Sequence, residues 1–310
     1  MNKIFFIRSD RLGEFLLSLY AIKLTKLNYP QSKIYLLAQK LNIELTRDID
    51  FIDYFLEYKN DRFCGYRGAF RLAKLLKKEK FDCIVILNPK KEFHLASFLA
   101  NIPLRVGYGR KWEFCLNRKI EDKKFLEEKH EVEYNIDLVS LICRKVYIPE
   151  ISLPVEDKKT LSFLKDELDL NEKFFVIHPF SSNLKKMIDN EFWVKLIRKI
   201  RDNFKREIVL IGADYEKEES LELEKETKIK NLVGKLTLKN LATFLKHNCF
   251  CLLGLDSAPL HLASILKVPV VGFFKITSPK RWGPYKTHSL IIENDFFSKL
   301  GEIISFLEKI

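Results

Sequence analysis

Segments typical of strands and of helices alternate along almost the whole chain. The apolar run KIFFIR (3–8) is followed by a turn and by apolar residues at helical spacing over 14–29. Two further strand-like runs, KIYLLA (33–38) and DCIVILN (82–88), are separated by an amphipathic segment that ends in FRLAKLLKKEK. Helix-like FHLASFLANI and strand-like RVGY continue the pattern. This alternation predicts an α/β fold with a parallel sheet covered by helices on both faces.

The alternation stops at VYIPEISLPVEDKKT (146–160), a polar stretch with two prolines, and then starts again. The second set of strand-like runs is FFVIHP (174–179), EIVLIGA (207–213), NLVG (231–234), CFCLLGL (249–255) and VPVVGFF (268–274). A chain of 310 residues exceeds what one core usually holds. We therefore expect two doubly wound domains, 1–155 and 156–310, with ligands at the carboxyl ends of the strands and in a cleft between facing halves. A closing helix over 296–310 packs either within its own domain or back on the first.

Several classes of protein are disfavoured by composition. Apolar runs such as VPVVGFF are far shorter than the roughly 18 residues that cross a bilayer. Charged residues within the first 14 positions interrupt what would be the apolar part of a secretory signal, so a cytoplasmic protein is expected. The six cysteines lack a CxxC spacing, which argues against a disulfide framework and a zinc site. No metal site is expected.

The net charge of +12 is unevenly distributed. The segment KNDRFCGYRGAFRLAKLLKKEK (59–80) holds eight basic residues and two acidic ones. A field of this sign favours an anionic partner, whether nucleic acid, an acidic lipid surface or an acidic substrate. A solvated, lysine-rich helix face explains the same pattern equally well.

An acid, a hydroxyl and an imidazole stand between apolar runs in LLGLDSAPLHLASILKVPVVGFF (252–274). A strand ends at Asp256 and Ser257, and Pro259 suits the first turn of the helix that follows. His261 would lie about one turn into this helix. Free amides and the helix dipole at such a start favour a phosphate or diphosphate, while a plain capped helix is the alternative.

The turn after the first strand, RSDRLGEF (8–15), occupies the corresponding place in the first half. Gly13 would let backbone approach a ligand closely, and Glu14 stands at a helix start. Its carboxylate could serve as a general base toward a substrate hydroxyl, or it could only complement the helix dipole. No GxGxxG motif is present, so the sequence does not favour nicotinamide or flavin binding.

Taken together, IRSDRLGEFLLSLYAIKL, HPFSSNLKKMIDNEFWVKLI, the 252–274 segment and SPKRWGPY resemble the ADP-heptose:lipopolysaccharide heptosyltransferases, glycosyltransferase family nine. The resemblance spans nearly the whole chain. It implies the GT-B fold, in which two Rossmann-like domains face a central cleft, with inversion at the anomeric carbon. It also implies that no metal and no cofactor is needed, an ADP-sugar being the donor substrate.

The resemblance assigns roles residue by residue. Glu14 stands where the family usually has a catalytic Asp, and Lys185 matches the lysine of a KxW motif that neutralises the donor phosphate, with Lys186 as the alternative if the register slips. Asp256 would hold sugar hydroxyls, and Ser257 with the following amides the diphosphate. The remaining residues implied in donor binding are Gly13, Glu216 at the ribose, Leu236 at the base, Ala258 in place of a common Gly, and His261.

The same resemblance explains the basic first half, because the N-terminal domain of GT-B enzymes receives the acceptor. An anionic, lipid-linked saccharide would contact that domain, with peripheral contact to the inner face of the cytoplasmic membrane. The candidate residues are Arg62, Arg67, Arg71, Arg110 and Lys111. Three alternatives stay open: a GT-B transferase for another nucleotide sugar or acceptor, a sugar-nucleotide-binding protein without turnover, and a nucleic-acid-binding module. The last rests on charge alone and is not expected.

Overall fold

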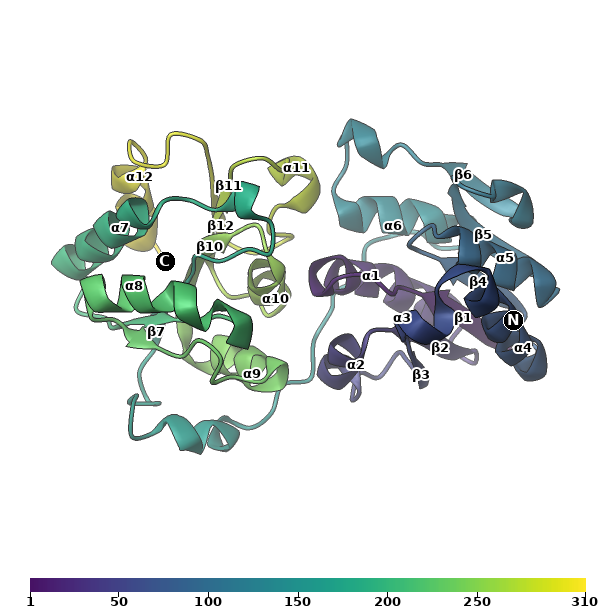
Figure 1. The fold of residues 1–310 in the computed structure, drawn as a ribbon, viewed down its shortest axis with the longest axis horizontal. Coiled ribbons are helices and arrows are strands. Elements are labelled where there is room, and N and C mark those ends of the chain that lie inside the picture. The colour runs from purple at the N-terminus through teal and green to yellow at the C-terminus, as the bar shows by residue number, and fades with distance from the viewer. The chain divides into compact units, whose positions relative to one another are not determined.

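The computed structural model describes all residues, Met1–Ile310, and the chain divides into two units, Met1–Ile151 and Ser152–Ile310. The division falls within the proline-containing segment in which the sequence analysis placed the boundary, four residues before the predicted position. Each unit contains one six-stranded sheet in which every strand pair is parallel (Figure 1). The predicted class, two doubly wound α/β domains, is confirmed.

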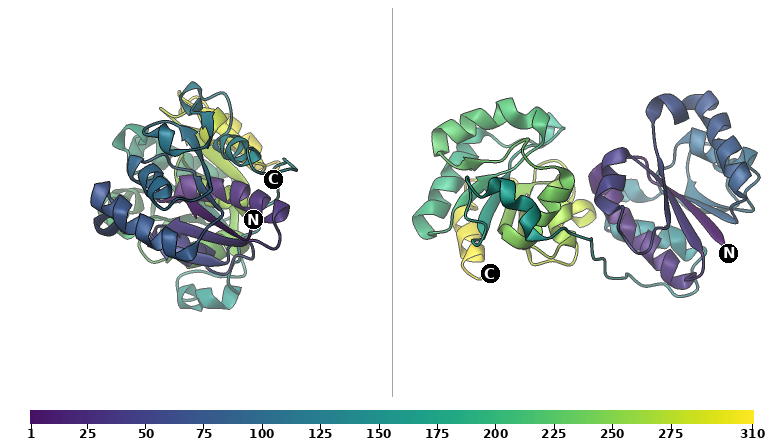
Figure 2. Two further views of the ribbon diagram at one scale, coloured as in Figure 1. Left: turned by 90° about the vertical axis from the view of Figure 1, so that its right-hand side faces the viewer. Right: turned by 90° about the horizontal axis from the view of Figure 1, so that it is seen from below.

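The sheet of the first unit has the strand order β3-β2-β1-β4-β5-β6. Its strands are β1 (Lys3–Ile7), β2 (Lys33–Ala38), β3 (Tyr54–Glu57), β4 (Cys83–Ile86), β5 (Leu104–Gly109) and β6 (Arg118–Glu121). Its helices are α1 (Leu12–Asn28), α2 (Lys40–Thr46), α3 (Asn60–Phe63), α4 (Gly65–Glu79), α5 (Lys91–Leu99) and α6 (Glu131–Ser140), with 3₁₀ turns η1 (Glu113–Cys115) and η2 (Lys124–Leu126). Helices α1 and α6 pack together on one face, and α4 and α5 on the other (Figure 2).

The sheet of the second unit has the order β12-β11-β10-β7-β8-β9. Its strands are β7 (Phe174–His178), β8 (Ile208–Leu210), β9 (Lys230–Asn231), β10 (Cys249–Leu255), β11 (Val270–Phe274) and β12 (Ser289–Glu293). Its helices are α7 (Asn190–Asn203), α8 (Lys217–Thr227), α9 (Leu238–Asn248), α10 (Ala258–Ile265), α11 (Pro279–Trp282) and α12 (Leu300–Leu307), with 3₁₀ turns η3 (Lys158–Leu164), η4 (Leu184–Lys186) and η5 (Asp214–Glu216).

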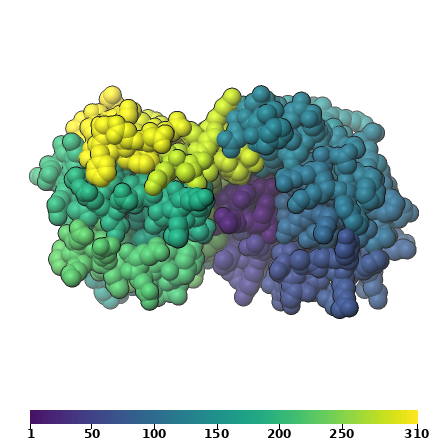
Figure 3. All heavy atoms as spheres, turned by 45° about the horizontal axis from the view of Figure 1, so that its top comes forward, coloured from purple at the N-terminus to yellow at the C-terminus, as the bar shows by residue number.

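The closing helix α12 belongs to the second unit. Its buried residues Ile303, Ile304 and Leu307 join the core cluster that also holds Trp193 of α7. In Figure 3 the last part of the chain, in yellow, forms a continuous stretch of this unit's surface. Of the two packings left open by the sequence, the structure therefore has the one within the helix's own domain.

The central strands β1, β4, β7 and β10 are buried almost throughout, because helices cover both faces of each sheet. The edge strands β3, β6 and β12 are mostly half-exposed or exposed, and the sequence analysis did not identify them. No helix combines the length and the apolar character that membrane crossing requires.

Candidate active site

Both sheets have a switch point, where neighbouring central strands connect to opposite sides of the sheet. In the second unit it lies between β7 and β10, since the chain runs from β7 to β8 and from β10 to β11. Ligands of doubly wound folds bind at the carboxyl ends of strands at such a point. Polar residues follow the ends of four adjacent strands here: Thr277 after β11, Asp256 and Ser257 after β10, His178 at the end of β7, and Glu216 after β8.

Asp256 is the centre of a buried cluster of polar side chains. Its carboxylate accepts a hydrogen bond from the Thr277 hydroxyl at 2.7 Å and lies 2.5 Å from Nζ of Lys186 and 3.6 Å from Nε2 of His261. Burial alone would raise the pKa of Asp256, but the contacts with His261 and Lys186 outweigh it and lower the pKa to about 2. A charged carboxylate in contact with an ammonium group and an imidazole is thus held directly after β10.

The structure favours Lys186 over Lys185 as the cation of this cluster. The side chain of Lys185 is exposed, whereas Nζ of Lys186 also donates to the Asp256 carbonyl oxygen at 3.1 Å. Lys275 donates to the Met187 carbonyl oxygen at 2.8 Å and holds the turn that carries both lysines. Lys186, which the sequence analysis named as the alternative to Lys185, is therefore the lysine that contacts Asp256.

Ser257 precedes the helix α10, as the sequence predicts, but its hydroxyl does not cap the helix. The Oγ atom lies 3.1 Å from Nδ1 of His178 and 3.1 Å from the Leu255 carbonyl oxygen. Ala258 and Pro259 form the first turn of α10. Proline has no N–H, and the Leu260 and His261 amides donate to the Ser257 carbonyl oxygen at 3.1 and 3.5 Å, so the Ala258 amide is the one without an intrahelical acceptor. Beyond this turn, His261 is buried, and its Nδ1 has no hydrogen-bond partner.

Glu216 lies at the end of η5, which follows β8, the last of the four strands that end in polar residues. Its carboxylate accepts from the Ala213 amide at 2.7 Å and stands 3.7 Å from Nε2 of His178. Burial opposes ionisation of Glu216, but its contacts with His178 and with the Ala213 amide prevail and lower its pKa. Leu236 is half-buried in the loop before α9. The sequence analysis did not single out His178, although its HP dipeptide at a strand end was a usable signal.

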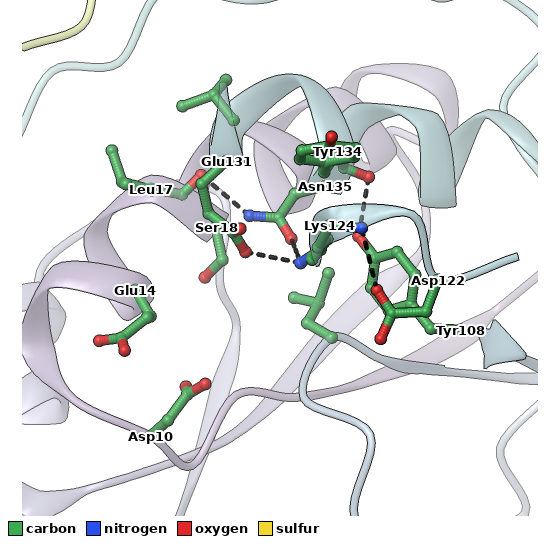
Figure 4. A network of polar contacts seen from close by, with 12 residues as sticks. Asp10, Glu14, Leu17, Ser18, Tyr108, Asp122, Lys124, Glu131, Tyr134 and Asn135 are labelled. Atoms are coloured by element: carbon green, nitrogen blue, oxygen red, sulfur yellow. Dashed lines mark hydrogen bonds and ion pairs between the residues drawn. The ribbon is translucent and has the colours of Figure 1, made fainter. Parts of the chain in front are cut away.

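The corresponding switch point of the first unit lies between β1 and β4 and is built around Arg8. The guanidinium is buried and donates to the Leu87 carbonyl oxygen after β4 at 3.1 Å. Its Nε lies 3.0 Å from the Asp10 carboxylate and donates to the Glu14 carbonyl oxygen at 3.2 Å. Glu131 of α6 stands 3.5 Å from Nη2 of Arg8 and pairs with Lys124 at 2.6 Å (Figure 4). This buried network fixes the turn that carries Asp10 and Glu14.

Glu14 stands in the first turn of α1, next to Gly13, and is half-buried. Burial raises its pKa, and the charge of Asp10 adds to the rise, while Arg8 and Arg11 oppose it. Figure 4 shows the Asp10 and Glu14 carboxylates turned toward the same space. A carboxylate with a raised pKa at the end of a sheet is suited to accept a proton.

The residues predicted to receive an acceptor lie on two segments of the first unit. Arg62, Arg67 and Arg71 are exposed on α3 and α4, and Arg110 and Lys111 are exposed in the loop after β5. Arg110 pairs with Asp122 at 3.3 Å.

Aromatic rings join these two segments. The Trp112 ring packs on Tyr66 of α4, with centroids 5.6 Å apart, and Phe114 follows at 5.7 Å. Lys111 and Trp112 both have left-handed backbone conformations, with φ of 45° and 51°. The loop is further held by His94, whose Nδ1 lies 2.7 Å from the Lys111 carbonyl oxygen. Basic and aromatic side chains therefore share one surface.

No group of three or more His, Cys, Asp or Glu side chains is arranged to bind a metal ion.

The fold of the chain, two α/β units in sequence, matches solved structures of glycosyltransferases. Escherichia coli ADP-heptose lipopolysaccharide heptosyltransferase II superposes with a TM-score of 0.80 over 100% of this chain and 99% of that chain, at 18% identity. Two Rossmann-like units, each with polar residues at its switch point, give the chain the GT-B fold.

Sequence comparison identifies the family. The family model described as glycosyltransferase family 9 (heptosyltransferase) matches residues 69–300, and the chain belongs to this family. A Haemophilus influenzae protein described only as a glycosyltransferase is 26% identical, over 92% of this chain and 86% of the relative. Lipopolysaccharide heptosyltransferase 3 of Escherichia coli K12 is 23% identical, over 88% of this chain and 82% of the relative. The resemblance described from the motifs is thereby confirmed.

Proposed function

We propose that the protein transfers a heptose from ADP-heptose to the inner core of a lipopolysaccharide acceptor, with inversion at the anomeric carbon and without a metal ion. Family membership and the relatives named above support this donor and acceptor. The observation that carries the proposal is the contact of Lys186 with Asp256 beside the first turn of α10. It puts a cation, a carboxylate and the Ala258 amide of a helix start at one switch point, which suits a sugar diphosphate.

In this proposal the leaving group is stabilised by the second unit. As the bond between the anomeric carbon and the bridging oxygen breaks, both electrons pass to the departing ADP. Lys186 and the Ala258 amide at the start of α10 would meet this developing charge, and fixed dipoles and cations act strongly in a site of low dielectric. Asp256 would accept hydrogen bonds from the sugar hydroxyls, and Glu216 from the ribose.

The acceptor hydroxyl is activated by the first unit. Glu14 would take its proton while the acceptor oxygen bonds to the anomeric carbon on the face opposite ADP, which gives inversion. The raised pKa of Glu14 strengthens it as a base. Arg8 and Asp10 would hold the turn that presents this carboxylate.

The surface on which Trp112 packs against Tyr66 would receive the acceptor's anionic saccharide and lipid at the inner face of the cytoplasmic membrane. Phe70 and Phe114 are 61% and 68% exposed, so apolar rings stand among the basic side chains. Lysine and arginine attract anionic headgroups, and aromatic rings insert at the interface.

The direct test is a transfer assay with ADP-heptose and purified inner-core lipopolysaccharide that lacks heptose. We expect a product heavier by one heptose, full activity in the presence of EDTA, and activity lower by at least about 100-fold for Glu14→Gln. Protection against thermal unfolding by ADP-heptose and not by UDP-sugars would accompany transfer. Protection by another nucleotide sugar alone would support the alternative GT-B transferase, and protection without turnover would support a binding protein. Either result would contradict the proposed activity.

A further inference from the structure

His178 joins two residues that the proposed function assigns to the donor. Its Nδ1 lies 3.1 Å from the Ser257 hydroxyl, and its Nε2 lies 3.7 Å from the Glu216 carboxylate. The imidazole is 5% exposed and Glu216 is 4% exposed. A carboxylate, an imidazole and a hydroxyl thus form a row from the end of β8 across β7 to β10.

The carboxylate fixes which ring nitrogen of the neutral imidazole carries hydrogen. The Glu216 carboxylate accepts from the Ala213 amide at 2.7 Å and lies 3.7 Å from Nε2 of His178, so it attracts the hydrogen of Nε2. Nδ1 of a neutral His178 is then an acceptor, and the Ser257 hydroxyl must supply the hydrogen between them. In that state the Ser257 proton points back into the protein, toward Nδ1. The Leu255 carbonyl oxygen, 3.1 Å from Oγ, can accept it only when Nδ1 carries a hydrogen of its own.

A bound diphosphate reverses this requirement. Phosphate oxygens are acceptors only, so the Ser257 hydroxyl must turn its hydrogen toward the ligand. A neutral His178 would then face the Ser257 oxygen with a lone pair at 3.1 Å, without a hydrogen between the two atoms. A proton on Nδ1 removes this conflict, because Nδ1–H then donates to the oxygen of Ser257.

We propose that His178 is a positioning residue which takes up one proton from solvent when a nucleoside diphosphate sugar binds, and thereby turns the Ser257 hydroxyl toward the diphosphate. The inference rests on the proposed function, because it needs a diphosphate at Ser257. No bond between heavy atoms changes: a proton from solvent forms an N–H bond at Nδ1, and this bond breaks again when the ligand leaves. The expected consequence is that the donor binds more tightly as the pH falls.

The groups around the imidazole are consistent with this role. From η5 it faces Glu216, which also hydrogen-bonds with Tyr215. From its own segment it meets the Phe180 ring, edge to face at 5.9 Å. From β10 it meets Gly254, where an added Cβ would stand 3.3 Å from Cβ of His178.

A further charged group near this row, Asp256, stands on the loop after β10. Asp256, next to Ser257, is already paired with Lys186 and His261. Glu216 is therefore the charged partner of His178, and an anionic ligand beside Ser257 would be the second.

The test measures proton uptake directly by titration calorimetry. ADP-glucose is the probe, since its diphosphate is a diester without a group that titrates near neutral pH. Binding enthalpies in two buffers of different ionisation enthalpy, at one pH, give the number of protons taken up. For the full chain we expect uptake between zero and one proton, and a Kd that weakens by up to about tenfold for each unit of rising pH.

Three variants identify the group responsible. We expect His178→Gln and Ser257→Ala to bind ADP-glucose more weakly and without this uptake, and His247→Gln, a histidine on α9, to behave like the unmodified chain. Binding without proton uptake, or uptake that persists in a folded His178→Gln protein, would overturn the inference and leave the proposed function intact. Failure of the unmodified chain to bind ADP-glucose, ADP-heptose or ADP would count against both.

Should His178→Gln fail to fold, carbon-13 shifts of the histidine rings in the unmodified chain decide the matter. Each protonation state has its own shift, and ADP-glucose should move one buried histidine toward the imidazolium form. No such change on saturation would refute the role of His178.

Discussion

The ammonium group of Lys186 lies 2.5 Å from the carboxylate of Asp256, while the preceding residue, Lys185, extends into solvent. Two adjacent lysines with the same chemistry thus have different environments. This contrast provides a matched pair of variants for the proposed leaving-group stabilisation.

Lys186→Ala should lower kcat for heptose transfer by about 100-fold, the order seen when one stabilising group is removed from an active site. Lys185→Ala should stay within about twofold, because an exposed lysine contributes little. Steady-state kinetics with ADP-heptose measures both. Equal losses of kcat in the two variants, or a larger loss for Lys185→Ala, would show that Lys186 is not the cation that stabilises the leaving group.

Glu14→Gln should reduce kcat by about 10² to 10⁴-fold, because the amide accepts no proton. The raised pKa sets the sign of the pH dependence: the base must be ionised, so kcat/KM falls as the pH drops through a value above the ordinary pKa of a glutamate. A pH–rate profile measures this acidic limb. An unchanged kcat in the folded Gln variant would eliminate Glu14 as the base.

Asp10→Asn should move that acidic limb to lower pH. The negative charge of Asp10 contributes to the raised pKa of Glu14, so its removal makes Glu14 easier to ionise. Asp122→Asn, at a partly exposed ion pair with Arg110, serves as the control and should leave the limb in place. A limb that keeps its position in Asp10→Asn would show that the two carboxylates do not interact.

Asp256 should contribute to stability in a pH window set by its lowered pKa. With an ordinary value of 3.8 and a folded value of about 2, ionised Asp256 stabilises the native state by about 2 kcal/mol. This contribution is present above pH 3.8 and is lost as the pH falls through about 2. Asp256→Asn should thus lower the free energy of urea unfolding at pH 7 and differ little at the acidic end. A difference in the free energy of unfolding between the unmodified chain and Asp256→Asn that stays constant down to pH 2 would argue against this linkage.

The paired substitution of Trp112 and Phe114 by Ala should weaken binding to vesicles that contain phosphatidylglycerol by about tenfold, because two rings no longer enter the interface. Added salt should weaken binding of the unmodified chain through the basic side chains. Phe163→Ala, half-exposed on η3, is the control. Sedimentation with vesicles measures all three proteins, and equal binding by the paired variant would remove Trp112 and Phe114 from the membrane contact.

The sequence by itself determined the elements that are buried from end to end. Strands such as β4 and β10 must be apolar on both faces, so their runs are visible in the sequence. The family motifs likewise located Asp256 and Ser257 after a strand and Glu14 in the first turn of a helix. These features depend on short stretches of chain, and a pattern over ten to twenty residues captures them.

The tertiary structure decided what depends on residues far apart in the chain. Edge strand β6, RKIE, has one neighbouring strand and an exposed surface, so no apolar run marks it. The choice of Lys186 over Lys185 is made by Asp256, 70 residues away. The buried pairing of Arg8 with Glu131 and the contact of His178 with Ser257 arise only when the strands align side by side. Local sequence carries the propensity of each element, but the partners of a buried charge are chosen by the sheet that brings them together.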